Sequence, residues 1–193
     1  MLKKILCSAL FISQVLLSHN SFAGLIELEV DQSSYQVNDT VTAKIIVSDF
    51  SHLLSAAYTE LVFDDNAISL IDWQFSNVFD DGLGSYQYAD DSGIGTLFLE
   101  DYADIFADIA TLTAQQGTSF VFATVQFKLL SEGLFQLGFN SDNSGLLSID
   151  NDFVQTSYAG AIINVGPVTS VPEPSTLILM FLGAIGLVTL RKN

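Results

Sequence analysis

Residues 40–47 read Thr-Val-Thr-Ala-Lys-Ile-Ile-Val, and apolar side chains occupy every second position from Val41 to Val47. Successive side chains of a β-strand point to opposite faces, so this pattern predicts a strand with one buried face. The same alternation recurs at residues 25–30, 56–63, 119–129, 134–139 and 159–165. Many short strands separated by turn residues predict an all-β fold of two packed antiparallel sheets, a sandwich or jelly roll.

The segment 119–129 is the longest of these strands. Its pattern places one set of side chains on the first face (Val121, Ala123, Val125, Phe127 and Leu129) and a second set opposite (Phe120, Phe122, Gln126 and Lys128). Aromatic residues on the second face indicate partial cover by long loops. The only helix expected before the C-terminal tail is a short one within residues 101–110.

The N-terminus has the pattern of a secretory signal peptide, expected to span residues 1–23. Lys3 and Lys4 precede an apolar run at 5–17, and Ser21-Phe22-Ala23 forms a small-x-small cleavage site. We therefore expect cleavage between Ala23 and Gly24. Because the one cysteine, Cys7, lies in this segment, the mature chain can form no disulfide and holds no thiol nucleophile.

The last residues, 171–193, form a separate unit. Val171 is followed by Pro172-Glu173-Pro174, then by an apolar run of 14 residues at 177–190 that we expect to form a short hydrophobic helix, and finally by Arg191-Lys192. The prolines keep the start of this segment extended. The apolar run is shorter than the roughly 20 residues of a spanning helix. The basic end places residues before it on the far side of the membrane. Residues 171–193 are therefore expected to be either a weak membrane anchor or a signal for processing of the C-terminus.

This order of elements resembles the PEP-CTERM sorting tail of Gram-negative bacteria. The resemblance implies an exosortase-type enzyme as partner, with Pro172, Glu173 and Pro174 as the recognition element and Arg191-Lys192 as the retention element. It also implies an exported protein, held in the membrane by its tail at least transiently and then delivered to the cell surface or extracellular matrix. Members of that family are associated with exopolysaccharide production.

The segment between the two signals, 24–170, has the length of one domain. It holds 21 acidic and 2 basic residues, a net charge of −19. Such a charge repels nucleic acids and anionic lipids and favours solubility. Nucleic-acid binding is therefore excluded as a function.

Residues 35–42 and 57–64 resemble the opening of a cohesin domain, and residues 123–128 with Glu132-Gly133 resemble its penultimate hairpin. The resemblance implies a cohesin-like β-sandwich at 24–166, followed by a linker at 167–170. Two departures are Asn38, where the family usually has glycine, and Asp65-Asn66, where it often has proline. Residues 73–116 match no part of the family's pattern. Dockerin binding is not carried over, because the sequence shows no dockerin-contact pattern.

Catalytic motifs are absent from the sequence. His52 is the only histidine after the signal peptide, and no Gly-x-Ser-x-Gly, His-Glu-x-x-His or phosphate-binding glycine loop occurs. We therefore expect a non-catalytic protein. A pair of carboxylates of the glycosidase type stays open, since the acids supply many pairs.

Calcium is the one cofactor that the sequence leaves open. Acidic turns at 140–145 and 150–152 offer hard oxygen ligands, and the candidate ligands are Asp142, Asn143, Asp150 and Asp152; the turns at 80–82 and 90–93 are similar. Their spacing is not that of an EF-hand, and the same residue types are common in turns that bind nothing.

Aromatic residues at alternate positions are the candidate glycan-binding side chains: Trp73, Phe75, Tyr86 and Tyr88. Flat rings with polar neighbours suit sugar rings, but large aromatic residues also fill cores.

Three hypotheses follow. The first is a binding or structural protein of the extracellular polysaccharide layer, the second an enzyme that acts on that polysaccharide through two carboxylates, and the third a protein–protein adhesion module. A flat apolar patch on one sheet would favour the third.

Overall fold

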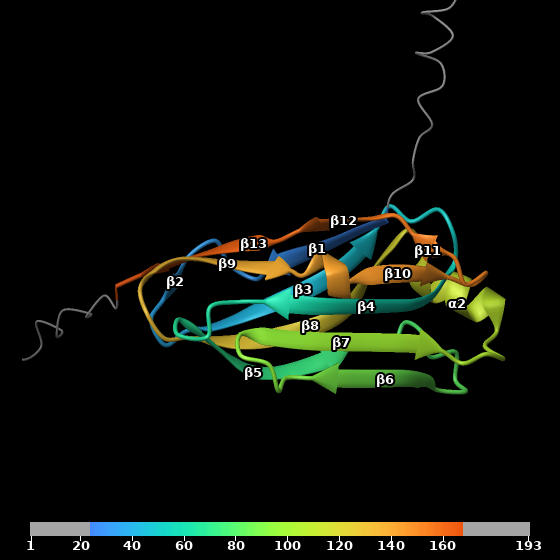
Figure 1. Cartoon of the computed structure of the whole chain (residues 1–193), viewed down its shortest axis with the longest axis horizontal. Helices are drawn as coiled ribbons and strands as arrows, with labels where there is room; N and C mark the ends of the chain where they lie inside the picture. The colour runs from blue at the N-terminus through green and yellow to red at the C-terminus, as the bar shows by residue number, and fades with distance from the viewer. Residues whose placement is uncertain (1–23, 168–193) are drawn as a thin grey trace, which may run out of the picture.

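The computed structural model describes residues 24–167 as two β-sheets packed face to face (Figure 1). This confirms the two-sheet sandwich expected from the alternating pattern. The signal peptide predicted at 1–23 and the hydrophobic helix predicted at 177–190 lie outside the described residues. No helix within residues 24–167 is long and apolar enough to cross a membrane.

The first sheet has the strand order β12-β1-β3-β8-β5. Its strands are β12 (Thr156–Ala159), β1 (Gly24–Val30), β3 (Thr40–Ser48), β8 (Ser119–Leu129) and β5 (Ile68–Phe75). β1 and β12 run parallel, and the other pairs are antiparallel.

The second sheet is built around β4 (Leu54–Val62). β7 (Thr96–Ala103) pairs with β4, and β6 (Ser85–Asp90) pairs only with β7. Both β10 (Gly145–Ser148) and β9 (Gly133–Phe139) also pair with β4, at its start and its end respectively. The sheet is completed by β11 (Phe153–Val154) beside β10, and by β13 (Ala161–Gly166) and β2 (Tyr35–Gln36) beyond β9.

The core lies between the sheets and is formed by the inward side chains of both. In β3, Val41, Ala43, Ile45 and Val47 are all fully buried, as the alternation predicts. Aromatic rings meet edge to face across the core, for example Phe63 with Phe127 at a centroid distance of 5.2 Å. Such pairs add to the hydrophobic contribution of their burial.

The pattern of β8 is interrupted by a β-bulge, which simple alternation does not predict. The β3–β8 register shifts at the bulge, because Ile45 pairs with Ala123 and Ile46 with Val121. Phe122 is the extra residue. Up to the bulge, Phe120 and Phe122 point into the core. After the bulge, Ala123 and Val125 point into the core. The prediction that Val121 shares the inner face was therefore wrong, and so was the assignment of the two phenylalanines to a loop-covered face.

Two other boundaries differ from expectation. The strand expected at 159–165 is divided at Gly160 into β12 and β13, which belong to different sheets. The helix expected at 101–110 was misplaced: residues 101–103 end β7, and α2 spans Ile109–Gln116. Its start is set by Asp108, whose carboxylate accepts a hydrogen bond from the Thr111 amide at 2.9 Å.

A carboxylate fastens the turn between β1 and β3. Asp31 accepts hydrogen bonds from the Tyr35 hydroxyl at 2.8 Å and from the Thr42 amide at 3.0 Å. Burial acts to raise the pKa of Asp31, but the hydrogen bonds outweigh it, and the net pKa is lowered from 3.8. The charged carboxylate is therefore the form that the folded chain prefers.

Asp31→Asn should lower the free energy of unfolding by about 1 kcal/mol at pH 7. Because the folded pKa is depressed, the contribution of the carboxylate is present above the unfolded pKa and is lost as pH falls through the folded pKa. The difference between wild type and variant should thus shrink below pH ~4. Urea titrations of the full chain at pH 7 and pH 3 measure this difference in the free energy of unfolding. Asp72→Asn, on an exposed site of β5, is the control and should show no such convergence.

Candidate binding surface

The outer face of β6, β7 and β4 carries five aromatic side chains, here called the aromatic face: Tyr58, Tyr86, Tyr88, Phe98 and Tyr102. The strand register places them together. Tyr86 lies opposite Tyr102, and Glu100 lies between Tyr88 on β6 and Tyr58 on β4. Alternate residues of β7, Leu97 and Leu99, point inward and are fully buried, so Phe98 and Tyr102 face outward.

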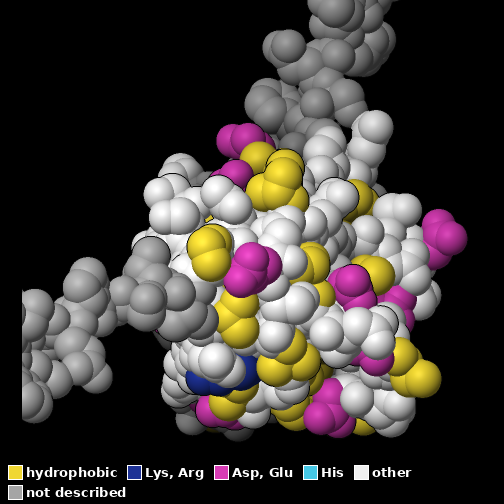
Figure 2. Space-filling view, turned by 90° about the vertical axis from the view of Figure 1, so that its left-hand side faces the viewer, with side chains coloured by type: hydrophobic (Ala, Val, Ile, Leu, Met, Phe, Trp, Pro, Cys, Tyr) yellow, Lys and Arg dark blue, Asp and Glu magenta, His cyan; other side chains and the backbone are white. Residues whose placement is uncertain are grey.

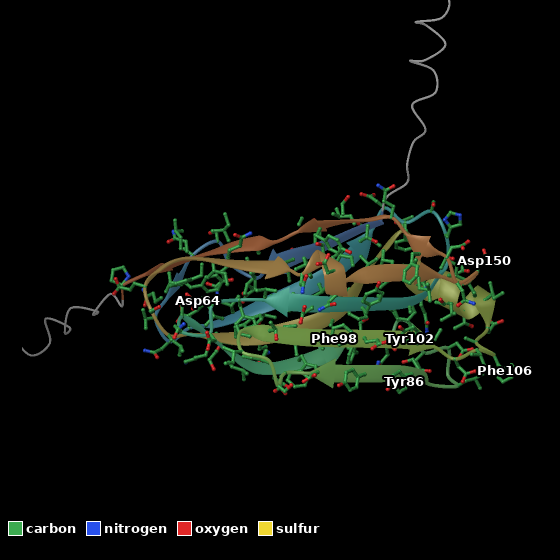
Figure 3. All side chains as sticks on the ribbon, in the orientation of Figure 1. Asp64, Tyr86, Phe98, Tyr102, Phe106 and Asp150 are labelled. Atoms are coloured by element: carbon green, nitrogen blue, oxygen red, sulfur yellow. The ribbon has the colours of Figure 1, made fainter. Side chains whose placement is uncertain are left out.

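The rings of the aromatic face contact one another and remain accessible. The centroids of Tyr86 and Tyr102 are 6.5 Å apart, and those of Tyr88 and Phe98 are 6.3 Å apart. Tyr86 is 63% exposed and Tyr88 44% exposed. Figure 3 shows Phe98, Tyr102 and Tyr86 following β7 and β6, with Phe106 beyond the end of these strands. The two ring pairs are tilted, with angles of 51° and 57° between the ring planes.

Carboxylates are set among these rings. Glu100 occupies the centre of the face, and Glu60 and Asp90 lie on either side of Phe98 in the register. Burial, followed by a hydrogen bond to Glu100, raises the pKa of Tyr102 to about 12. Because Tyr102 stays neutral at any physiological pH, its hydroxyl serves as a stable hydrogen-bond donor.

The β10 side of the aromatic face is held in place by close contacts. A Cβ on Gly145 would lie 2.6 Å from the Tyr58 hydroxyl, so the absence of a side chain there lets the ring lie over the β10 backbone. Glu60 accepts a hydrogen bond from the Asn143 side-chain amide at 2.8 Å. The face therefore presents a preorganised arrangement of rings and carboxylates, which lowers the entropic cost of binding.

A hollow of about 480 Å³ adjoins the face where β6 begins and β7 ends. Tyr86 and Tyr102 line one side of it, and Leu83 and Ile105 line the other. Leu83 is 67% exposed and Ile105 is 89% exposed. The apolar surface thus continues from the rings to the end of the sandwich.

The four predicted glycan-binding residues divide between the two sheets. Trp73 and Phe75 lie on β5, partly buried against the core, and the Phe75 ring is 5.7 Å from that of Phe122. Tyr86 and Tyr88 lie on β6 and face solvent. The structure therefore brings Tyr86 and Tyr88 together but not with Trp73. Sequence reasoning missed Phe98 and Tyr102, because residues 96–103 do not alternate: three apolar residues, 97–99, are followed by two adjacent acids, Glu100 and Asp101.

The four predicted calcium ligands also lie apart. Asp142 and Asn143 belong to the 3-10 turn η1 (Ser141–Asn143) that precedes β10, whereas Asp150 and Asp152 lie in the turn after it. These sites are at opposite ends of β10, and all four side chains are exposed. Within residues 24–167 no three His, Cys, Asp or Glu side chains are grouped so that they could hold a metal ion.

The surroundings of His52 do not resemble a catalytic triad. The His52 ring shares a hydrogen bond of 2.8 Å with the hydroxyl of the adjacent Ser51, and both residues are exposed. A triad requires a carboxylate that orients the ring and a serine activated by it in a substrate-binding site.

The surface charge agrees with the composition. Figure 2 shows acidic side chains spread over one end of the molecule, with little basic surface among them. Both lysines of the described chain, Lys44 and Lys128, are on the first sheet, away from the aromatic face.

Comparison with protein families matches residues 170–192 to the PEP-CTERM protein-sorting motif. This match confirms the sorting tail and indicates an exported protein targeted to the cell envelope. Comparison with curated proteins finds no match.

Solved structures of cohesin domains match the fold. A type II cohesin domain from the cellulosome of Acetivibrio cellulolyticus is 20% identical, with a TM-score of 0.62 over 74% of this chain and 95% of that one. A type I cohesin from a cohesin–dockerin complex of Clostridium thermocellum is 13% identical, with a TM-score of 0.59 over 76% and 96%. A non-cellulosomal cohesin from Archaeoglobus fulgidus is 11% identical, with a TM-score of 0.55 over 75% and 91%. The chain therefore has a cohesin-like fold.

Proposed function

We propose that this chain is an exported, non-catalytic binding protein of the cell envelope and that the aromatic face binds a protein partner. The observation that carries the proposal is the row of exposed rings around Glu100 on the outer face of β6, β7 and β4. Large apolar surfaces of this kind are uncommon on proteins that bind nothing. Tyrosine is also enriched at protein interfaces, because its ring is rigid and its hydroxyl forms hydrogen bonds.

The chemistry of the face defines the partner. Glu100, Glu60 and Asp90 would pair with basic side chains, and the rings around them would attract the same cations. We therefore expect a partner surface with lysine or arginine residues set among apolar side chains. The cohesin-like fold supports protein binding, since one of the similar structures is a cohesin in complex with a dockerin.

A photo-crosslinking amino acid at position 88, introduced into the full chain in the producing bacterium, tests this proposal. We expect a discrete crosslinked protein, and we expect Tyr86→Ser combined with Tyr102→Ser to abolish it. The control places the crosslinker at Ile162, which is 70% exposed on β13, outside the aromatic face. Equal crosslinking from position 162, or retention of the product in the double variant, would contradict the proposal.

A glycan of the extracellular polysaccharide layer is the second candidate ligand. Tyr86 and Tyr88 lie on the same face of β6, with Glu100 opposite Tyr88, and both rings are accessible to a sugar. A glycan array probed with the full chain tests this alternative. If the protein binds a glycan on the array, and Tyr88→Ala abolishes this binding while Trp73→Ala preserves it, glycan binding is assigned to the aromatic face. Release of reducing ends in the same wells would instead indicate an enzyme.

We infer that an exosortase-type enzyme processes the tail, and one substitution tests this. Glu173→Ala should leave the protein in the membrane with its tail uncut, because the change removes the charged group of the recognition element. Cell fractionation and mass spectrometry of the C-terminus measure the outcome. Thr176→Ala is the control and should be processed as wild type. Normal release of the Glu173 variant would refute the assignment.

A further inference from the structure

Asp101 is a buried carboxylate on the inner face of β7. It is only 1% exposed, and across the sheet it pairs with Ala57 on β4 and Gln87 on β6. One oxygen, Oδ2, accepts a hydrogen bond from the Gln87 side-chain amide at 3.1 Å. The other, Oδ1, is buried and has no hydrogen-bond partner. A buried carboxylate is unfavourable unless hydrogen bonds, a bound proton or an opposite charge compensate it.

No basic side chain of the described chain can provide that compensation. Lys44 is exposed on β3, and the Lys128 amine donates a hydrogen bond to the carbonyl of Asn38. Both lysines are in the opposite sheet. Residues 24–167 therefore supply no counter-charge for Asp101, which leaves a bound proton or a cation from the medium to compensate it.

Other oxygen-bearing side chains surround Asp101. The amide nitrogen of Gln87 also donates to Asn77 Oδ1 at 3.0 Å, so one amide group links Asn77 and Asp101. Burial raises the pKa of Asp101, the polar side chains of Ser85 and Gln87 lower it, and the nearby charge of Asp80 raises it further. Asn77 and Gln87 are exposed, so the polar groups that adjoin Asp101 lie at the surface of the fold.

The loop that supplies Asn77 and Asp80 is rigidly placed. Phe79, between them, is fully buried and packs edge-on against Phe120 at 5.8 Å and Phe122 at 6.5 Å. Asp80 Oδ1 accepts hydrogen bonds from the amides of Gly82 and Gly84 at 2.8 and 2.9 Å. These contacts hold the Asp80 carboxylate beside β6 and β7 in the absence of a ligand.

We propose that Asp101 and Asp80, with the side-chain oxygens of Asn77 and Gln87, form a binding site for one divalent cation, and that the cation is calcium. Two carboxylates balance the charge of the ion, and amide oxygens complete a set of hard ligands suited to calcium. Rotation of the Gln87 amide by half a turn presents its oxygen in place of its nitrogen. The site is distinct from the acidic turns around β10, and it does not depend on the proposed partner.

The consequence for the surface follows from strand geometry. Gln87 lies between Tyr86 and Tyr88 on β6, an edge strand held only by β7. A cation bound to Gln87, Asp101 and the preceding loop would tie β6 to the body of the fold from the inside. Calcium should therefore stiffen the strand that presents the two most exposed rings of the aromatic face.

Terbium luminescence of the full chain, excited through tyrosine and competed with calcium, tests the site. We expect one saturable terbium ion that calcium displaces, and a higher melting temperature in calcium than in sodium chloride of equal ionic strength. Asp101→Asn, which keeps the shape of the side chain, should weaken calcium binding at least tenfold. It should fold as well as wild type without calcium, because it removes the buried charge. Asn77→Ala should also weaken binding.

Asp150→Asn is the matched control, because it removes one exposed carboxylate from a turn outside the site. It should bind calcium as wild type does. The proposal is overturned if wild type shows no saturable binding, if Asp101→Asn binds as tightly as wild type, or if Asp150→Asn loses the ion instead.

Discussion

Phe122→Ala should lower the free energy of unfolding by about 3–5 kcal/mol, a large part of the stability of a domain of this size. Phe122 is fully buried, and its ring meets those of Phe75 and Phe79 at centroid distances of 5.7 and 6.5 Å. Truncation leaves a cavity between the sheets that the surrounding strands fill only in part. Urea denaturation of the full chain, followed by circular dichroism, measures the change.

The adjacent residue provides the control. Val121 is only partly buried, because the β-bulge turns it to the outer face. Val121→Ala should cost about 1 kcal/mol or less. If Val121→Ala destabilised the protein as much as Phe122→Ala, uninterrupted alternation along β8 would hold and the bulge would be wrong.

Gln116→Ala should cost about 2–5 kcal/mol, although glutamine is a residue usually found on surfaces. Gln116 ends α2 and is 1% exposed. Its side chain accepts a hydrogen bond from the Leu54 amide at 2.9 Å and donates one to the Leu54 carbonyl at 2.8 Å. The side chain thus replaces a neighbouring strand at the start of β4. Its removal leaves two buried backbone groups unpaired.

The neighbouring glutamine is the control for this prediction. Gln115 is exposed and donates one hydrogen bond, to the carbonyl of Asp80 at 2.8 Å. Gln115→Ala should cost about 1 kcal/mol or less, because water replaces the lost partner. Equal melting temperatures for the two variants would show that Gln116 does not hold β4.

The sequence by itself determined the fold class and the destination of the protein. The alternation of apolar and polar residues at 40–47, and its recurrence along the chain, was enough to predict a two-sheet sandwich. This alternation is a local property of the chain. The sorting tail was also predictable, since the sorting motif at residues 170–192 is a short linear pattern. The net charge of the body excluded nucleic acid as a partner, because a sum of charges does not depend on how the chain folds.

Only the tertiary structure decided which residues share a surface. Trp73 and Tyr86 have similar sequence contexts, yet β5 and β6 belong to opposite sheets. The loop between these strands crosses from one sheet to the other and so separates the two residues. The bulge at Phe122 likewise depends on how β8 pairs with β3. Asp101 looks like any other acidic residue in the sequence, and its burial arises because β4 and β6 flank β7. Strand pairing between distant residues is a property of the packed chain, so alternation alone assigns faces within one strand but not neighbours between strands.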